Sequence, residues 1–325
     1  MLKAAIYGVG RWGETLVNAA KDSGKIRIVK GVTRDPAKHR EFTDKTGVAL
    51  VKNYADVLGD PEVKAVVLAT PHSLHHEHVV QAARAGKHVY CEKPFTLTRA
   101  SAEDAVAACK AAGVTLALGF NRRYAPSFRE LLRRVNAGEI GDVLHIEAQH
   151  SGPTGYRLKA GTWRSTRKEA PGGGMTARGI HALDNMINIA GLVSSVYAFS
   201  DKRKLPVDID IDDTTSMLLR FAGGVTGYLA TVFVTGELYR VHVFGSKGWI
   251  EMRGDTRLTV CGIEGVPEEI NLPKASKERA LLDAFADAVA AKQPFLVPPE
   301  EVINGIAVLE AIEGAAAKGQ PVRIG

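Results

Sequence analysis

The stretch that decides the fold is KAAIYGVGRWG, residues 3–13. It begins as an apolar run and ends in the spacing G-x-G-x-x-G, formed by Gly8, Gly10 and Gly13. In such a turn the first glycine permits a tight bend, the second lets the backbone approach a pyrophosphate, and the third lets a helix pack on the strand. Because the spacing stands between a predicted strand and a predicted helix, it indicates a dinucleotide-binding fold rather than an ordinary glycine turn.

Outward from this stretch, the first 120 residues alternate between strands and helices. Short, continuously apolar runs predict strands that are buried on both faces. These strands are expected at residues 3–8, 26–32, 65–69, 88–91 and 115–118. The helices between them are expected at residues 14–21, 37–45, 74–85 and 102–111. This alternation predicts an α/β domain over residues 1–120, with the doubly wound parallel sheet of a Rossmann fold.

After Gly119 the pattern changes. From residue 193 to 261, apolar and polar residues alternate with period two, which predicts an antiparallel sheet with two unlike faces. A further strand is expected at residues 143–149, and helices are expected at residues 127–135, 175–190, 277–291 and 300–318. We therefore expect a second, α+β domain over residues 121–325, built on a largely antiparallel open sheet. Because helices do not obviously cover its apolar face, this sheet predicts a homo-oligomer, either a dimer or a tetramer.

The composition narrows the class of protein. The 325 residues are 45% hydrophobic and 24% charged, as in a globular protein. No apolar run reaches the roughly 18–20 residues of a membrane helix, and the first strand leaves no room for a secretory signal. The three cysteines form no C-x-x-C pair, which indicates a reducing, cytoplasmic location and no zinc site. The net charge of +6 comes from scattered residues, so we expect no nucleic-acid partner.

The end of the second predicted strand, GVTRD at residues 31–35, bears on the choice of dinucleotide. Enzymes that prefer NAD place an acidic residue here, which accepts a hydrogen bond from the ribose 2′-hydroxyl. Thr33 stands there instead and Arg34 follows, a combination that suits the 2′-phosphate of NADP. The alternative is a solvated turn in which Asp35 caps the next helix. We predict NADP as the cofactor, with NAD as the other possibility.

Residues 86–94, GKHVYCEKP, place a lysine at the end of another predicted strand. In open parallel sheets, ligands bind at the carboxyl ends of the strands, so Lys93 is expected where chemistry takes place. A lysine there donates or accepts a proton when its surroundings lower its pKa. The simpler interpretation is a surface lysine that pairs with Glu92. The strand-end position and Pro94 favour the catalytic interpretation.

Four histidines, His72, His75, His76 and His78, lie close together in the chain. Such a cluster raises the possibility of a metal site, but no cysteine or acidic quartet accompanies it. We therefore expect no metal.

Several motifs together resemble the Gfo/Idh/MocA oxidoreductases over essentially the whole chain. They are the glycine-rich turn, TPHSLH at residues 70–75, EKP at 92–94, GFNRRY at 119–124, Trp163-Arg164, PGGG at 171–174 and GIHALD at 179–184. In the second of these motifs, His72 stands where the family commonly has asparagine. The resemblance implies an N-terminal Rossmann domain, and a C-terminal domain whose sheet often forms the oligomer interface.

The resemblance also implies an activity and roles for residues. Family members mostly exchange a hydride between NAD(P) and a sugar, cyclitol or related alcohol. The family lysine, here Lys93, relays the proton of the reacting oxygen, and the family histidine, here His181, contacts that oxygen or shares the acid–base role. The cofactor residues are expected to be Gly8, Gly10, Arg11, Trp12, Gly13, Thr33, Arg34, Thr70, Pro71, His72, His75, Glu92 and Lys93. The substrate residues are expected to be Asn121, Arg123, Tyr124, Trp163, Arg164 and Asp184.

Simpler interpretations of some of these residues stay open. Asn121, Arg123 and Tyr124 cap the following helix in one interpretation and contact substrate or nicotinamide in the other. Trp163 and Arg164 either pack within a loop or stack at the mouth of a substrate site. His181 fits an amphipathic helix as well as a site.

One position departs from the family pattern. Many members carry an aspartate four residues before the histidine, and this chain has Ala177. Positions four apart share a helical face, so that aspartate would stand beside His181. Asp184 or Thr176 is a partial substitute. The departure places more of the acid–base work on Lys93 and His181, and it weakens any inference of inositol or simple polyol oxidation.

We therefore expect an NAD(P)-dependent dehydrogenase or reductase for a sugar-like, polyol or other small alcohol or carbonyl substrate. One alternative is an NADP-binding sensor or scaffold with weak turnover. Another is an enzyme for a non-sugar substrate, such as an aromatic dihydrodiol or an imine.

Overall fold

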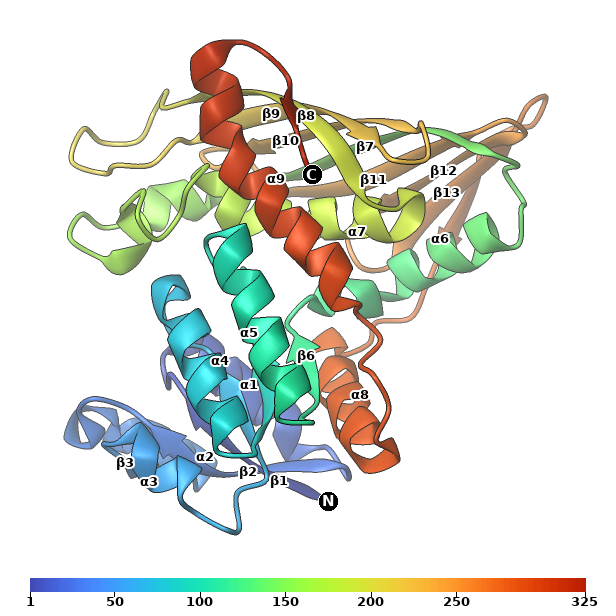
Figure 1. Ribbon diagram of the computed structural model, residues 1–325. Coiled ribbons are helices and arrows are strands. Elements are labelled where there is room, and N and C mark those ends of the chain that lie inside the picture. The colour runs from blue at the N-terminus through green and yellow to red at the C-terminus, as the bar shows by residue number, and fades with distance from the viewer. The chain divides into compact units, whose positions relative to one another are not determined.

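Six parallel strands form the centre of the first of two units. The computed structural model describes residues 1–325. The first unit contains residues 1–96, 100–121 and 276–299, and the second contains residues 97–99, 122–275 and 300–325. Figure 1 labels the elements of both. Each unit is described by itself.

The sheet of the first unit has the strand order β3-β2-β1-β4-β5-β6, and every neighbouring pair is parallel. Its strands are β1 (Leu2–Tyr7), β2 (Ile26–Val32), β3 (Ala49–Val51), β4 (Ala65–Leu68), β5 (His88–Cys91) and β6 (Leu116–Leu118). The order reverses between β1 and β4, as in a doubly wound dinucleotide-binding sheet. The predicted Rossmann fold is confirmed.

Helices connect the strands of this sheet (Figure 1). They are α1 (Arg11–Lys21), η1 (Pro36–His39), α2 (Arg40–Thr46), α3 (Tyr54–Leu58), η2 (His72–Leu74), α4 (His75–Arg84) and α5 (Arg99–Ala111). The helix expected over residues 37–45 is in fact the short 3-10 turn η1 followed by α2. The sequence analysis missed β3 and α3, because three- and five-residue elements are too short to show a period.

Helix α8 (Lys277–Ala291) packs on α1 and β2, although it follows the second sheet in the chain. Leu281, Leu282 and Phe285 are buried, and the rings of Phe285 and Tyr90 lie 6.2 Å apart. Lys25 adds an ion pair with Asp287 at 2.6 Å. The first unit is therefore completed by a segment from late in the chain.

The second unit contains a nine-stranded sheet in the order β14-β13-β12-β11-β7-β10-β9-β8-β15. All neighbours are antiparallel except β7 and β10, so the predicted, largely antiparallel sheet is confirmed. The strands are β7 (Val143–Ser151), β8 (Val193–Asp201), β9 (Thr214–Phe221), β10 (Thr226–Val232), β11 (Leu238–Gly245), β12 (Gly248–Arg253), β13 (Arg257–Gly262), β14 (Glu268–Asn271) and β15 (Val322–Arg323).

Helices α6 (Pro126–Asn136), α7 (Ile180–Ala190) and α9 (Pro299–Lys318) belong to the same unit. Helix α6 packs on β12 and β13, and α7 packs on β7 and β11. The amide group of Asn304 joins α9 to β8, since it accepts from the Val193 N–H at 2.8 Å and donates to the Val193 carbonyl at 2.9 Å. Tyr239, Val241 and Val243 are buried, as their alternation along β11 predicts.

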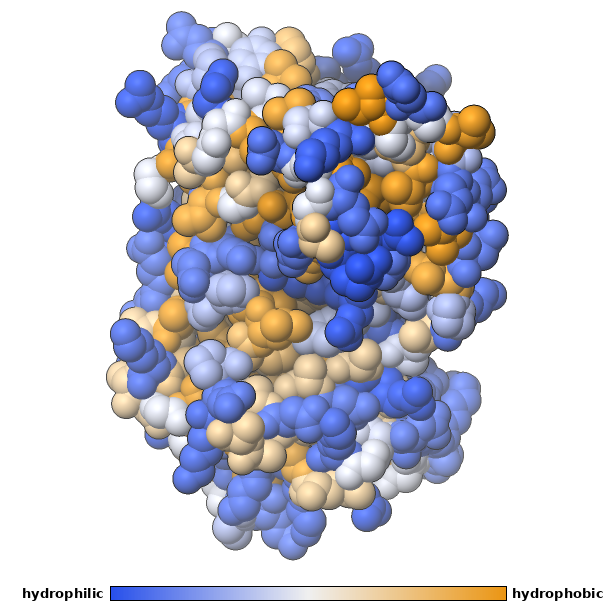
Figure 2. All heavy atoms as spheres, turned by 90° about the vertical axis from the view of Figure 1, so that its right-hand side faces the viewer, coloured by the Kyte–Doolittle hydropathy of each residue, from blue (hydrophilic) through white to orange (hydrophobic).

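Hydrophobic side chains are exposed on the strands of this sheet. Leu144, Phe199 and Leu218 are exposed by 56%, 59% and 57%, and Tyr228 pairs with Leu218 across β9 and β10. The surface seen in Figure 2 likewise carries hydrophobic residues among hydrophilic ones. No helix combines the length and the apolar character needed to cross a membrane.

Candidate functional site

The glycine-rich turn after β1 is held together by close backbone contacts. Gly8 has φ +101°, and a Cβ added there would lie 2.5 Å from the Ala69 carbonyl oxygen. A Cβ on Gly13 would lie 1.9 Å from the Gly8 carbonyl oxygen. Gly13 therefore lets helix α1 pack directly on the end of β1, and Gly8 lets the turn pass close to the end of β4.

Gly10 has a different role. It is the N-cap of α1, and a Cβ added there would meet nothing within 4 Å. No side chain caps this helix, so the N–H groups of Arg11, Trp12 and Gly13 are available at its positive end. Open space before uncapped backbone donors is what a pyrophosphate requires. The turn fits a bound dinucleotide.

The end of β2 leaves one cation available. The Thr33 N–H donates to the Val51 carbonyl at 3.1 Å, and Asp35 pairs with Lys38 at 3.2 Å. No side-chain hydrogen bond caps the short helix η1 that follows. The Arg34 side chain is exposed and makes no ion pair. Thr33 and Arg34 thus lie at the strand end expected for the ribose contacts, and those contacts stay a prediction.

His75 connects two predicted site segments in the first unit. Its buried ring places Nδ1 2.9 Å from the Pro94 carbonyl and Nε2 3.0 Å from the Thr70 carbonyl. The turn after β4 is therefore tied to the residue that follows Lys93. The ring has its hydrogen bonds to the backbone, a role that the sequence analysis did not foresee.

His76 and His78, two other histidines of the cluster, contact separate partners. His76 lies 2.7 Å from Asp104, whereas the His78 ring stacks on Tyr7 at 4.4 Å. Burial lowers the pKa of His78 to about 4, so its ring is neutral at physiological pH. No group of three or more histidine, cysteine or acidic side chains is arranged to hold a metal ion.

A buried carboxyl group lies beside Lys93. The Tyr90 hydroxyl donates to Glu92 Oε1 at 2.8 Å, and the Lys93 N–H donates to Oε2 at 3.2 Å. A Cβ on Gly119 would come within 3.0 Å of that same Oε2. Burial raises the pKa of Glu92, while the neighbouring Trp12 and Lys93 act against that rise. Lys93 itself is half-buried at the carboxyl end of β5, and its catalytic role stays a prediction.

In the second unit, glycines bring a short π-helix, Met175–Gly179, close to its surroundings. Gly173 has φ +54°, and a Cβ there would lie 1.9 Å from the Asp212 carbonyl oxygen. A Cβ on Gly179 would lie 2.1 Å from Met175 Sδ and 2.5 Å from Thr231 Oγ1. His181 follows in the first turn of α7 and is buried. π-Helical turns are frequent at functional sites.

Ala177 lies within this π-helix and packs against an apolar cluster. The buried members of the cluster are Ala170, Leu205, Ile209, Ile211, Phe233 and Val234. A carboxylate at this position would lose its hydration against these side chains. Thr176 is buried and donates to the Pro171 carbonyl.

Two predicted substrate residues form an ion pair in the second unit. Arg123 donates to both oxygens of Asp184, at 2.8 and 2.6 Å, and also to Glu301 at 2.6 Å. The Arg123 and Asp184 side chains are almost completely buried. The sequence analysis missed Glu301, which nothing in the chain marks as a partner of residues so far away.

Asn121 and Tyr124, the other predicted substrate residues near Arg123, do not cap helix α6, because no side chain caps that helix. Asn121 belongs to the first unit and donates to Glu278 at 2.8 Å. Tyr124 is buried, and burial raises the pKa of its hydroxyl to about 12. Their substrate contacts stay predictions.

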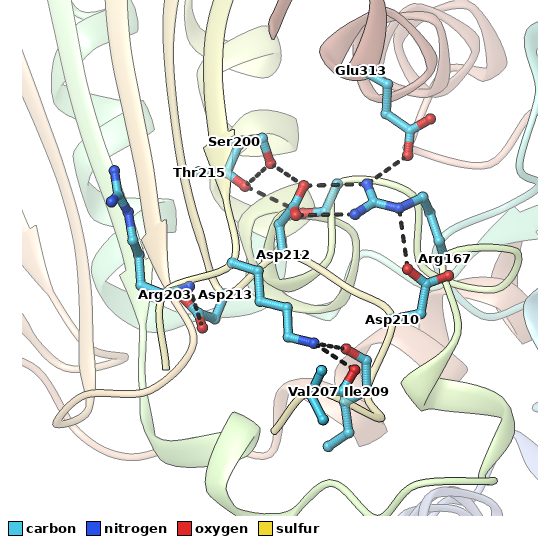
Figure 3. A network of polar contacts seen from close by, with 12 residues as sticks. Arg167, Ser200, Arg203, Val207, Ile209, Asp210, Asp212, Asp213, Thr215 and Glu313 are labelled. Carbon is cyan, nitrogen blue, oxygen red and sulfur yellow. Dashed lines mark hydrogen bonds and ion pairs between the residues drawn. The ribbon is translucent and has the colours of Figure 1, made fainter. Parts of the chain in front are cut away.

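Trp163 and Arg164 form a cation–π pair, with the Arg164 guanidinium carbon 4.1 Å from the Trp163 ring centroid. The residue that follows the pair is hydrogen-bonded to a distant part of the chain, because the Asp210 N–H donates to the Ser165 carbonyl at 3.0 Å. Arg167 binds Asp212 at 3.0 Å and Glu313 at 3.1 Å, as Figure 3 shows. The loop that carries the pair is thus tied both to the loop before β9 and to α9.

The sequence analysis also missed a buried polar group next to His181. The rings of His150 and His181 lie 5.8 Å apart, and the rings of His150 and Tyr239 lie 4.6 Å apart. The available signal was the alternation along β7, which puts His150 on the buried face with Ile146 and Ala148.

Known proteins resemble both halves of the chain. Residues 2–120 match the family described as "Oxidoreductase family, NAD-binding Rossmann fold", and residues 128–251 match the "GFO/IDH/MocA C-terminal domain". The chain is 32% identical to myo-inositol 2-dehydrogenase of Thermotoga maritima, over 77% of this chain and 74% of that protein. It is 26% identical to 1,5-anhydro-D-fructose reductase of Ensifer adhaerens, over 97% and 99%.

A solved structure agrees with these relatives. The aldose-aldose oxidoreductase from Caulobacter crescentus, complexed with glycerol, superposes with a TM-score of 0.89 and 26% identity. The match covers 99% of each chain. The glycine-rich turn, the strand-end lysine and the second sheet thus occur in a chain whose two halves each match the same family. The chain belongs to the Gfo/Idh/MocA family of NAD(P)-dependent oxidoreductases.

Proposed function

We propose that the protein transfers a hydride between a nicotinamide dinucleotide, with NADP preferred, and a hydroxyl- or carbonyl-bearing carbon of a small sugar-like or polyol substrate. The observation that carries this proposal is the position of Lys93. It follows β5 at the carboxyl edge of the sheet whose first strand leads into the glycine-rich turn. The names of the inositol and anhydrofructose relatives support the substrate class.

The chain's own residues would bind and orient the dinucleotide. The backbone N–H groups at the start of α1 would bind the pyrophosphate, and Gly10 leaves them accessible. Thr33 and Arg34 would bind the 2′-phosphate. The other proposed cofactor residues are Thr70, Pro71, His72, His75 and Glu92. When bound, the nicotinamide supplies or accepts the hydride.

Lys93 would exchange a proton with the reacting oxygen of the substrate, and His181 would assist in that transfer. The buried Glu92 beside Lys93 supports this role. An ionised Glu92 favours the cationic form of the lysine, whereas a protonated Glu92 no longer does so. Substrate contacts are proposed for Asn121, Arg123, Tyr124, Trp163, Arg164 and Asp184. Of these, Arg123 and Asp184 would act as the buried pair described above.

A turnover screen tests the proposal. Sugars, polyols, aldehydes and aromatic dihydrodiols are each incubated with NADP or NADPH, and the absorbance band of the reduced nicotinamide is followed. With the best substrate, Lys93→Ala is expected to lower kcat about 10²- to 10⁴-fold, because the acid–base group is lost. Lys110→Ala, at an exposed position of α5, is the matched control. Full turnover by Lys93→Ala would refute the mechanism.

A second candidate function is an NADP-binding sensor with weak turnover. Ala177 favours it, since this position packs into an apolar cluster and offers no acid. The sensor predicts tight cofactor binding with no substrate-dependent absorbance change in the same screen. A dihydrodiol or imine that turns over faster than any sugar would instead identify a non-sugar enzyme.

We further propose a homo-oligomer, a dimer or tetramer formed through the exposed strands of the second sheet. Leu144, Phe199 and Leu218 would be covered there. Light scattering of Leu218→Asp against the unaltered chain tests this, with dissociation as the expected result. The three buried, unpaired thiols of Cys91, Cys109 and Cys261 are in keeping with the cytoplasmic location that we propose.

A further inference from the structure

His150 occupies the last buried position of the inward face of β7, where Ile146 and Ala148 precede it. The ring is 3% exposed, yet it is polar. Its Nδ1 lies 2.7 Å from the Arg178 carbonyl oxygen. A carbonyl only accepts hydrogen bonds, so Nδ1 carries the proton of this imidazole.

The carbonyl that His150 binds belongs to the π-helix before His181. Arg178 is also held through its side chain, since Nη1 donates to Thr154 at 2.9 Å and Nη2 pairs with Glu237. Gly152 makes room for this guanidinium, because a Cβ there would lie 2.7 Å from it. Arg178 is therefore fixed at both ends, and His150 supplies the backbone anchor.

The His150 ring also lies close to two other rings. It is 5.8 Å from His181 and 4.6 Å from Tyr239. Tyr239 is held in turn by Asn185, whose Nδ2 donates to its hydroxyl at 2.7 Å, and Arg122 lies 4.4 Å above the Tyr239 ring centroid. Tyr239, held in this way, would thus resist movement of the His150 ring.

We propose that His150 is a positioning residue for His181. Its Nδ1–H holds the Arg178 carbonyl, three residues before His181, and its ring packs beside the His181 ring. Together these contacts set the direction in which α7 presents His181. The catalytic consequence rests on the proposed function, in which His181 assists proton transfer.

Two isosteric variants separate this role from a general loss of packing. The amide nitrogen of asparagine reaches the place of Nδ1, whereas that of glutamine reaches the place of Nε2. His150→Asn is therefore expected to keep kcat within about threefold, while His150→Gln lowers it about 100-fold with KM little changed, as for a misplaced catalytic group. Equal activity of both variants, or activity with glutamine alone, would overturn the positioning role.

A spectroscopic measurement on the unaltered protein complements the kinetics. In ¹⁵N-histidine-labelled protein, the His150 ring, assigned by its disappearance in His150→Asn, is expected to show a proton on Nδ1 at neutral pH. A proton on Nε2 alone overturns the inference even if His150→Gln does not fold. The turnover of His181→Ala is measured in parallel. Full turnover by His181→Ala would refute the proposed role of His181. Reduced turnover by His181→Ala, together with full turnover by His150→Gln, would refute the present inference alone.

Discussion

Two glycine-rich segments serve the two units in different ways. In the turn after β1, Gly13 approaches Gly8 within the same short loop. In the segment before α7, Gly173 approaches Asp212 and Gly179 approaches Thr231, both far along the chain. The contact between Gly13 and Gly8 is therefore local, although Gly8 also approaches Ala69 after β4. The second segment acquires its geometry only when the sheet and the loop before β9 have assembled. An anion site can be built locally, whereas the setting of His181 is a tertiary property.

The largest expected effect tests the local segment. Gly13→Ala would force a Cβ against the Gly8 backbone, which cannot yield as a side chain would. We expect a loss of about 3 kcal/mol or more in the free energy of unfolding, measured with urea. Gly10→Ala is the matched variant, because its φ of −71° suits alanine and its Cβ meets nothing. Gly10→Ala should keep the stability and weaken NADP binding, and equal stability of both variants would contradict the packing argument.

A substitution in the glycine-rich segment before α7 should lower the stability less, and it should change kcat instead of NADP binding. In Gly179→Ala the new Cβ meets Met175 Sδ and Thr231 Oγ1, and the flexible methionine can move. We expect a loss of about 1–3 kcal/mol in stability. NADP affinity by calorimetry should stay the same while kcat falls. Gly314→Ala in α9, where a Cβ has open space, is the control. Weakened NADP binding by Gly179→Ala would contradict the inference that the two segments serve different functions.

A smaller effect concerns the cofactor's 2′-phosphate. Arg34→Ala should weaken NADP binding about tenfold, or about 1.4 kcal/mol, and leave NAD binding unchanged. Titration with both dinucleotides measures this. Arg27→Ala, exposed on the same strand, serves for comparison. If the ratio of the two affinities did not change, Arg34 would not select the cofactor.

The smallest effect concerns the loop of Trp163. Arg167→Met removes half-exposed ion pairs to Asp212 and Glu313, which should cost about 0.5–1 kcal/mol. Without these ion pairs, the turn that contains Trp163 is less ordered in the free protein. We expect KM to rise about threefold with kcat unchanged, because ordering this loop then costs free energy when substrate binds. Arg203→Met, which loses only an exposed pair with Asp201, is the control. A kcat effect without a KM effect would argue against this anchoring role.

The same contrast explains what the sequence could predict. The order of strands and helices in the first unit, the glycine-rich turn and the buried face of β11 follow from local periodicity and spacing. The partners of Asp184, the contact of His75 with the Pro94 carbonyl and the contacts of His150 do not, because they join residues that are distant in the chain. The Arg123–Asp184 pair shows the limit well: both residues were predicted as site residues, but their mutual contact was not.

Helix α8 has a consequence for how this protein can be divided. The chain passes between the units at residues 96/97, 99/100, 121/122, 275/276 and 299/300. A fragment that ends near residue 121 lacks Phe285, the ring that packs near Tyr90 two residues before Glu92. Exchange of the second half between relatives would carry part of the first sheet's packing with it. A transferable first unit would therefore have to include residues 276–299 together with the first 121 residues.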